Sequence, residues 1–390
     1  VYHATFAAHD QIEIAQTENL PLPSYTEAGL NELLFKDNYA NLSEYLACFG
    51  RTIPALQTPE NLERVACEFA LDNQAEGVCY VEVRFAPQFH VNRIMDVESA
   101  LRSVTAGLER AAREYNSQPA VRDGTLPSFQ FGIIACAMRS FGHGFSEYFD
   151  MFLSAHRYSD PPTIHALASY ELVRACVKAR DKAGIPVVGF DLAGAEAGNP
   201  AEIHQQAYHY AHKHFMHLTV HAGEEYGAES IFQAITDLHA DRIGHGYCLF
   251  DVEKISDPAI TDPADYVRRL AQYIADRRIT IEVCLTSNLQ TNPAIGSIAR
   301  HNFRRMLEAK LSCTLCTDNR TVSKTTASRE IEQAVRTFQL HGETLKDLII
   351  YGFKRSFFPG TYAEKRRYVR QVIDRYELLA RQHFHRPERT

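Results

Sequence analysis

Short apolar runs alternate with longer segments of helical periodicity along most of this chain. Seven of the runs are rich in strand-forming residues. They span approximately Val78–Phe85, Phe129–Ala137, Ile185–Leu192, His217–His221, Arg242–His245, Ile279–Leu285 and Ser312–Thr317. Apolar residues at helical spacing lie between them, for example over Leu101–Ala112, Ala166–Ala179, Ile231–Leu238 and Tyr266–Ile274. This order is typical of a parallel sheet whose strands are joined by crossover helices and buried on both faces.

Seven strands are one fewer than the eight that close a barrel. Residues of about 11–75, before the first run, and about 328–390, after the last, have helical patterns. We therefore predict a (β/α)8 TIM-type barrel with extra helices, in which the first strand is missing from this chain. Barrels of this length commonly form one unit, so residues 1–390 are expected to be a single domain.

The charge balance limits the classes of partner. A net charge of −7 leaves no basic surplus for a phosphate backbone, so we expect a small-molecule substrate and no polymeric nucleic acid. No apolar run approaches the roughly 18 residues that span a bilayer, and Val1–Phe6 lacks the pattern of a signal peptide. We predict a cytoplasmic protein without a membrane partner. The oligomeric state cannot be read from the sequence.

The nine cysteines are odd in number, and most lie inside apolar runs, which favours buried, reduced thiols. Cys313 and Cys316 match the C-x-x-C pattern. Residues three apart on a strand face opposite sides of the sheet, so we do not expect this pair to bind a metal together.

Polar side chains stand where three of the predicted strands end. His221, His245 and Asp318 each occupy the carboxyl end of a run, and this is the face on which barrel enzymes build active sites. A single histidine at a strand end is more often a hydrogen-bonded structural residue than a metal ligand. Three such endings together favour a site.

The segment from His221 to Glu224 combines an imidazole with a carboxylate three residues later, and Gly223 lets the backbone turn sharply between them. An imidazole nitrogen and the Asp318 oxygen form a ligand mixture that suits a catalytic zinc ion. Glu224 could move protons, or it could be a favourable negative charge at a helix N-terminus.

Several motifs together resemble the adenosine deaminase family. They are His221-Ala222-Gly223-Glu224, Arg242-Ile243-Gly244-His245-Gly246, Thr286-Ser287-Asn288, Thr317-Asp318-Asn319, Asp191-Leu192-Ala193-Gly194, Tyr80-Val81-Glu82-Val83-Arg84-Phe85 and Met138-Arg139. Their order and spacing match the family from about Leu42 to Asn319. The resemblance implies hydrolytic replacement of the 6-amino group of a purine nucleoside.

The resemblance also implies a role for each site residue. His221 and Asp318 would bind one Zn²⁺ per chain, Glu224 would act at purine N1, and His245 would orient and deprotonate the attacking water. The chemistry needs these parts, because adenine C6 is a poor electrophile. Zinc lowers the pKa of bound water to about 7, and an acid at N1 makes the ring accept the attack.

Further positions are implied for recognition of the substrate. Gly194 resembles the backbone donor to purine N3, although a tight turn would need glycine equally well. Ser287 and Glu282 resemble residues that hydrogen-bond around the catalytic histidine. An apolar wall over base and sugar is implied for Leu42, Tyr45, Leu46, Phe49 and Met138, of which the first four could equally be core.

Two positions depart from the family pattern. Asn319 stands where many members have a second aspartate toward purine N7, and its amide can donate there without first acquiring a proton. The family also carries a His-x-His pair on its first strand, and none occurs in the first ninety residues, where His3 and His9 are wrongly spaced. Aligning Gln11–Pro23 with the helix after that strand would place the pair upstream of Val1.

Three alternatives stay open at this point. The substrate could be free adenine or a modified adenine nucleoside such as aminofutalosine, because the chemistry is the same. The chain could be a catalytically silent relative that only binds a ligand. It could also be another barrel metallohydrolase that acts on a carbonyl, against which the purine contacts of Gly194 and Asn319 argue.

Overall fold

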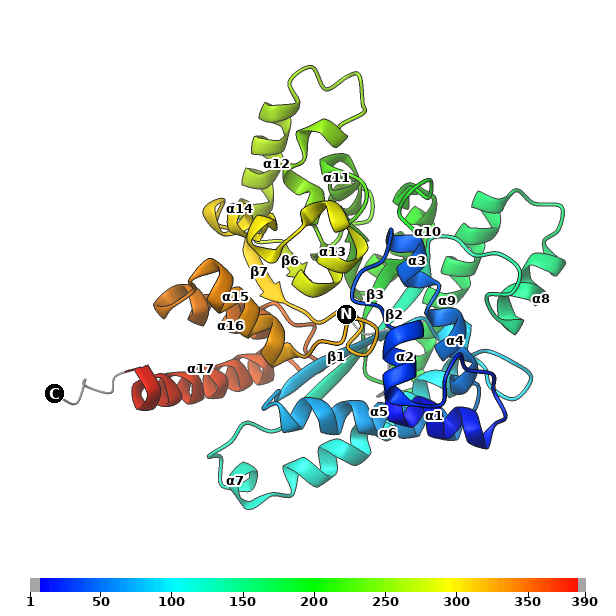
Figure 1. Ribbon diagram of the computed structural model, residues 1–390, viewed down its shortest axis with the longest axis horizontal. Helices are drawn as coiled ribbons and strands as arrows, with labels where there is room; N and C mark the ends of the chain where they lie inside the picture. Colours follow the sequence, from blue (N-terminus) through cyan, green and yellow to red (C-terminus); the bar gives the residue numbers. More distant parts are fainter. Residues whose placement is uncertain (1–7, 385–390) are drawn as a thin grey trace.

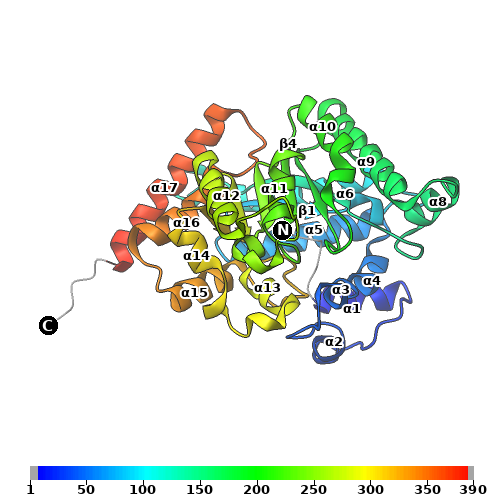
Figure 2. The same cartoon turned by 90° about the horizontal axis from the view of Figure 1, so that it is seen from above.

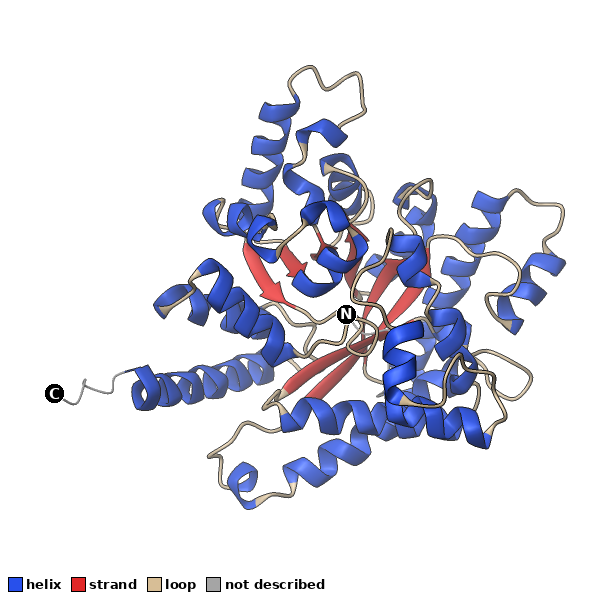
Figure 3. Ribbon diagram, in the orientation of Figure 1, coloured by secondary structure: helices blue, strands red, loops and turns tan. Residues whose placement is uncertain are grey.

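A computed structural model describes residues 8–384 as a sheet of seven parallel strands surrounded by helices (Figure 3). Neighbouring strands pair in chain order, from β1 to β7. The strands are β1 (Tyr80–Phe85), β2 (Gln130–Met138), β3 (Val187–Ala193), β4 (His217–Ala222), β5 (Arg242–His245), β6 (Thr280–Val283) and β7 (Ser312–Leu315). Each lies within two residues of its predicted ends, so the strand prediction is confirmed.

Helices occupy the segments between and beyond the strands. They are α1 (Ala8–Thr17), α2 (Glu27–Leu33), α3 (Leu42–Leu46), α4 (Phe49–Thr52), α5 (Pro59–Ala75), α6 (Val97–Asn116), α7 (Pro119–Arg122), α8 (Glu147–Ala155), α9 (Pro161–Ala183), α10 (Gln205–Lys213), α11 (Ala228–Thr236), α12 (Pro263–Arg277), α13 (Leu285–Thr291), α14 (Phe303–Glu308), α15 (Ala327–Phe338), α16 (Gly342–Lys354) and α17 (Tyr362–Phe384). The strands curl around the centre and the helices lie outside them (Figure 1). The fold is thus of the (β/α)8 barrel type, and residues 8–384 supply seven of its eight strands.

The strands are apolar because both of their faces are covered. In β2, every residue from Gly132 to Met138 is buried, and β3 is buried over most of its length. Ile133, Phe190 and Ile281 belong to one continuous core that also includes the inner faces of the surrounding helices. Burial on both faces explains why these segments read as unbroken apolar runs rather than alternating ones.

Helices α1 to α4 form a layer beside the barrel rather than part of its ring (Figure 2). Asn41 caps α3 by accepting from the Glu44 amide, which starts the helix at Leu42. The apolar cluster of this layer packs against Val322, which follows β7. The layer thereby places α3 close to the carboxyl end of the last strand. His9 lies in α1, whereas His3 is outside the described residues.

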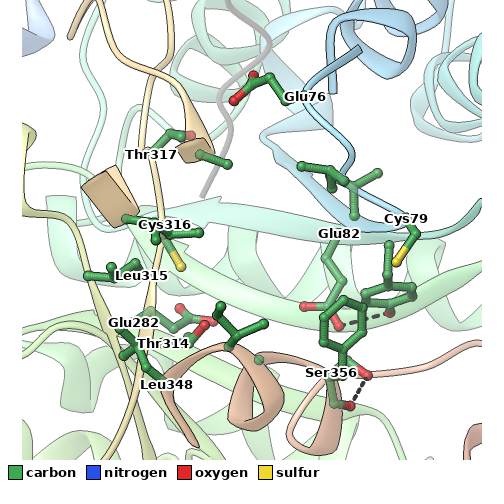
Figure 4. Close-up of a pocket in the computed structure, with 18 of the residues that line it drawn as sticks. Glu76, Cys79, Glu82, Glu282, Thr314, Leu315, Cys316, Thr317, Leu348 and Ser356 are labelled. Atoms are coloured by element: carbon green, nitrogen blue, oxygen red, sulfur yellow. Dashed lines mark hydrogen bonds between the residues drawn. The ribbon is translucent and has the colours of Figure 1, made fainter. Parts of the chain in front are cut away.

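Strands β1 and β7 form the two edges of the described sheet, and they are not paired with each other. A cavity of about 310 Å³ lies between them, bounded by residues such as Cys79 and Glu82 on one side and Thr314 and Cys316 on the other (Figure 4). This gap is where an eighth strand would close the barrel.

The long terminal helix α17 has one face packed on the barrel. Tyr368 and Val372 are buried beside Tyr80, and the Tyr368 hydroxyl donates to the carbonyl of Cys79. This helix is therefore packed on one face rather than solvated all round. Among residues 8–384, no helix combines the length and apolarity that crossing a bilayer requires.

Candidate metal centre and active site

Three strands of the barrel end in side chains that could hold a metal ion. His221 is the penultimate residue of β4, His245 is the last residue of β5, and Asp318 follows β7. One ligand atom from each lies within 4.8 Å of the others, and all three residues are buried. The structure thus brings together the three polar strand ends that the sequence singled out.

The backbone at two of these positions is left-handed. His245 has a φ of 65° and Asp318 a φ of 54°. Residues other than glycine adopt this conformation uncommonly, and such outliers concentrate at functional sites, where the surrounding structure holds them. The strand ends at His245 and Asp318 are therefore shaped for the position of their side chains.

His221 is held by a buried carboxylate. Asp191 Oδ2 lies 2.9 Å from His221 Nδ1, and it accepts from the Cys136 thiol at 2.8 Å. Burial opposes ionisation of Asp191, but Arg84 and His221 outweigh it and hold its pKa well below the usual range. An ionised partner at Nδ1 keeps the proton on that nitrogen, which leaves Nε2 of His221 free to bind a metal.

Cys136, Asp191 and His221 also bring one ligand atom each within 4.8 Å of one another. Arg84 Nη1 lies 3.6 Å from the Asp191 carboxylate and neutralises it. Burial raises the pKa of the Cys136 thiol well above its usual range, so the thiol stays protonated. These features suit support of His221 better than a second centre.

Asp318 is ionised and fully hydrogen-bonded. Its Oδ2 accepts from Ser287 Oγ at 2.6 Å and from the Tyr45 hydroxyl at 3.4 Å, and its Oδ1 accepts from Asn319 Nδ2 at 3.0 Å. Burial raises the pKa of Asp318, but His245, Ser287 and His221 outweigh it and the net pKa is lowered. A charged oxygen donor is thus available beside two imidazoles.

Glu224 and His245 lie side by side, and their pKa values are shifted in opposite directions. Glu224 Oε2 is 3.6 Å from His245 Nε2. Burial, with the negative charges of Asp318, Glu196 and Glu225, raises the pKa of Glu224 well above its usual range. Burial lowers the pKa of His245 to about 4. Near neutral pH the pair therefore consists of a carboxylic acid and a neutral imidazole.

Gly194 follows β3 directly, in a backbone conformation that favours glycine. Its φ is 107°, and a Cβ placed there would lie 3.1 Å from Met138 Cε. Met138 is itself the last residue of β2 and is buried. The Gly194 and Met138 positions implied by the resemblance are therefore adjacent.

The residues of α3 and α4 that were implied for the apolar wall over the substrate differ in burial. Leu42 and Tyr45 are buried in the cluster beside the barrel, whereas Leu46 and Phe49 are only partly covered by it. Asn319 Nδ2 donates to the Tyr45 hydroxyl at 2.9 Å as well as to Asp318. Tyr45 thus reaches Asp318 and Asn319, the residues that follow β7.

Glu282, which the resemblance placed around the catalytic histidine, lies opposite Gly244 and pairs with two arginines. Its carboxylate pairs with Arg84 Nη2 at 2.6 Å and with Arg242 Nε at 2.8 Å. Ser287 contacts Asp318 rather than His245. The side chain that reaches His245 Nδ1 is Asn288, at 3.0 Å, from the short helix α13.

Sequence reasoning assigned no role to several residues that contact the site, namely Arg84, Asp191, Arg139, Glu196 and Asn288. Arg139 donates to the His221 carbonyl at 2.6 Å and fixes the end of β4. Ionisable residues inside apolar strands, such as Arg84 and Asp191, were a usable signal, because a buried charge requires a partner. Glu196 and Asn288 lie outside strands and carried no such signal.

The donor set fits a catalytic zinc ion. Neutral imidazole and carboxylate are the ligands that zinc hydrolases use, and a carboxylate beside the second nitrogen of a ligating histidine, as Asp191 is beside His221, is common around such metals. His221, His245 and Asp318 would lie around the ion.

Comparison with known proteins identifies the family of this chain. The family model described as adenosine deaminase matches residues 9–160 and 153–376. An adenosine deaminase of Mycobacterium avium is 34% identical over 348 residues, which cover 88% of this chain and 84% of the relative.

Two solved structures share the fold. An adenine deaminase from Arthrobacter aurescens superposes with a TM-score of 0.73 at 20% identity, covering 96% of this chain and 97% of its own. An amidohydrolase from Burkholderia ambifaria, solved with bound zinc, gives 0.72 at 21% identity, covering 97% and 91%. Given the extent of the sequence matches, this chain belongs to the adenosine deaminase family.

Proposed function

We propose that this chain catalyses the hydrolytic deamination of a 6-aminopurine nucleoside, with adenosine and deoxyadenosine as substrates. Water replaces the 6-amino group, so the products are inosine or deoxyinosine and ammonia. The name of the Mycobacterium avium relative supports this substrate.

The observation that carries the proposal is the pair formed by Glu224 and His245. A protonated Glu224 can give its proton to N1 of the purine, which makes C6 electrophilic. A neutral His245 beside it can take a proton from the attacking water. Hydrolysis of an aminopurine needs both transfers at neighbouring atoms, and the two side chains lie 3.6 Å apart.

We assign one zinc ion per chain to His221 and Asp318. When bound, zinc supplies Lewis-acid chemistry that makes water a stronger acid near neutral pH. Asp318 is ionised and its three hydrogen-bond donors fix its orientation, so it can also orient water for attack.

Recognition of the ring would come from the loops around the site. The Gly194 amide is proposed to donate to purine N3, and its glycine-only backbone leaves room for a close approach. Asn319 is proposed to donate to N7, in exchange for a donor bond that it now makes to Tyr45 or Asp318.

The test is to incubate zinc-loaded protein with adenosine and to follow the loss of absorbance near the adenosine maximum together with ammonia release. Deoxyadenosine, adenine and aminofutalosine are measured in parallel. We expect the two nucleosides to have the highest kcat/KM. Stoichiometric zinc without ammonia release from any of the four would contradict the proposal and favour a silent binding protein.

Free adenine is the second candidate substrate. The Arthrobacter aurescens structure is named as an adenine deaminase, and it shares this fold along nearly the whole chain. A kcat/KM for adenine above that for adenosine in the same experiment would favour this candidate.

A further inference from the structure

Glu196 is a buried carboxylate that lies next to the catalytic loop and has no cationic partner within 4.0 Å among residues 8–384. It is 2% exposed and stands two residues after Gly194. Its hydrogen-bond donors are backbone amides, with distances of 2.9 Å to Gly223, 3.0 Å to Glu224, 2.7 Å to Glu225 and 3.0 Å to Tyr226. Ser230 Oγ donates to the same carboxylate.

Four successive amides can converge on one carboxylate because the chain turns at Gly223, whose φ is 72°. Amides arranged in this way form a concave anion-binding nest. The nest is filled here by a side chain of the same protein. Since the Glu224 amide is one of the four, the carboxylate fixes the backbone from which the proposed acid projects.

Hydrogen bonds also run in the opposite direction, from amides of the loop that holds Glu196 to side chains of the loop that holds Glu224. The Glu225 carboxylate accepts from the Glu196 amide at 3.1 Å and from the Ala197 amide at 3.0 Å. The Tyr226 hydroxyl accepts from the Gly198 amide at 2.6 Å. The loop that follows Gly194 and the loop that carries Glu224 therefore form one reciprocal clasp.

We propose that Glu196 is a positioning residue, which sets the Glu224 carboxyl group relative to the Gly194 amide and thereby holds purine N1 against its proton donor. This inference rests on the proposed function. The two groups would contact N1 and N3, the two nitrogens that flank C2 in the six-membered ring, so a shift of one loop would leave the substrate bound but misaligned. A misplacement of about 1 Å costs about 100-fold in rate.

The central variant is Glu196→Gln, which keeps the shape but places an amide NH2 against backbone N–H donors. We expect kcat for adenosine to fall about 100-fold. KM and zinc stoichiometry should stay within about threefold, as should the affinity for an adenosine analogue with carbon in place of N1. The analogue has no N1 for Glu224 to protonate, so its binding reports the site without the acid.

Two further variants separate positioning from folding. Glu229→Gln is the matched control. The Glu229 carboxylate also accepts hydrogen bonds from backbone amides, those of Ser256 at 3.0 Å and Asp257 at 2.7 Å, but these amides belong to a loop outside the clasp. This control variant should leave kcat within about threefold of the native value. Glu225→Ala loosens the clasp from its other side, and we expect about a tenfold fall in kcat without loss of zinc.

The outcomes are distinguishable from a failure of the proposed function. If the native protein deaminates none of the 6-aminopurines, the function and the positioning role fall together. If the native protein is active and Glu196→Gln keeps its kcat, only the positioning role is overturned. The positioning role is also overturned if kcat in Glu196→Gln and Glu225→Ala falls only in proportion to lost zinc or lost folded protein. A fall in kcat with zinc and analogue affinity retained supports it.

Discussion

Glu224 and Glu282 are two glutamates of the same barrel whose side chains are 9% and 5% exposed, yet the shielding from water has opposite results for them. Glu282 lies between Arg84 and Arg242, and these charges outweigh burial and lower its pKa to about 2. Among residues 8–384, no arginine or lysine lies within 4.0 Å of the Glu224 carboxylate, and burial with neighbouring negative charges raises its pKa. The comparison teaches that pairing, rather than depth, decides whether a buried carboxyl group is a fixed charge or a proton donor.

The largest effect should follow from removing Asp318, the charged ligand in the proposed zinc site. Asp318→Ala leaves no donor atom on β7, so we expect zinc to fall below stoichiometric content and turnover to be lost. Metal analysis after dialysis and the ammonia assay measure the two effects. Asp318→Asn keeps an oxygen but not the charge, and its turnover should fall even in saturating zinc. Full zinc and activity in Asp318→Ala would remove β7 from the site.

The next largest effect should come from Glu224→Gln, which keeps the side-chain shape but cannot donate the acidic proton. We expect kcat to fall about 1000-fold while zinc content and substrate affinity are retained. Steady-state kinetics and equilibrium binding of adenosine measure this. Near-normal turnover would exclude Glu224 as the acid.

Glu224→Gln should also change how kcat/KM depends on pH. Native kcat/KM should fall on the alkaline side as Glu224 loses its proton, because the acid form is the active one. It should fall on the acid side near pH 4 as His245 becomes charged. In Glu224→Gln the alkaline decline due to this group should disappear.

Arg84→Met removes an arginine that pairs with two buried carboxylates. This change leaves the buried Asp191 and Glu282 charges without one of their partners, and we expect a loss of about 3–5 kcal/mol in the free energy of unfolding. Urea unfolding measures it. The matched control is Arg110→Met, because Arg110 pairs with Glu63 at 2.6 Å on the surface and should lose no more than about 1 kcal/mol. Equal losses would show that burial adds nothing to the cost.

A smaller effect is expected from Asn288→Ala. The Asn288 amide is 3.0 Å from His245 Nδ1, and its own oxygen contacts His301. Without it the His245 ring loses its orienting partner, and we expect turnover to fall about tenfold with zinc retained. The same kcat as the native protein would leave the His245 ring oriented by packing alone.

The smallest effect concerns Tyr45→Phe. The hydroxyl contacts Ser323, Asn319 and Asp318, so its loss should reduce the free energy of unfolding by about 1 kcal/mol. Urea unfolding is again the measurement. Tyr25→Phe is the control, since the exposed Tyr25 hydroxyl makes a single bond to the Leu20 carbonyl. An equal change in both variants would assign no special weight to the Tyr45 contacts.

Much of the fold was predictable because burial on both faces leaves continuous apolar runs, and the strand ends marked His221, His245 and Asp318. Strand boundaries were harder to predict where a helix follows the strand almost immediately. The run to Leu285 extends past β6 because α13 begins at that residue. The pairing of Arg84 with Glu282 joins residues 198 positions apart, and only the folded sheet reveals it. The Glu196 clasp depends on loop geometry, which apolar periodicity does not record.

The left-handed backbone at His245 and Asp318 has a consequence for engineering. A non-glycine residue in this conformation costs about 1–2 kcal/mol, so glycine at either position would relieve strain while deleting a functional side chain. A selection that ranks variants by thermal resistance alone would therefore reward the loss of the site. Directed evolution of this protein needs a turnover screen at every round, because its most stable descendants are expected to be its inactive ones.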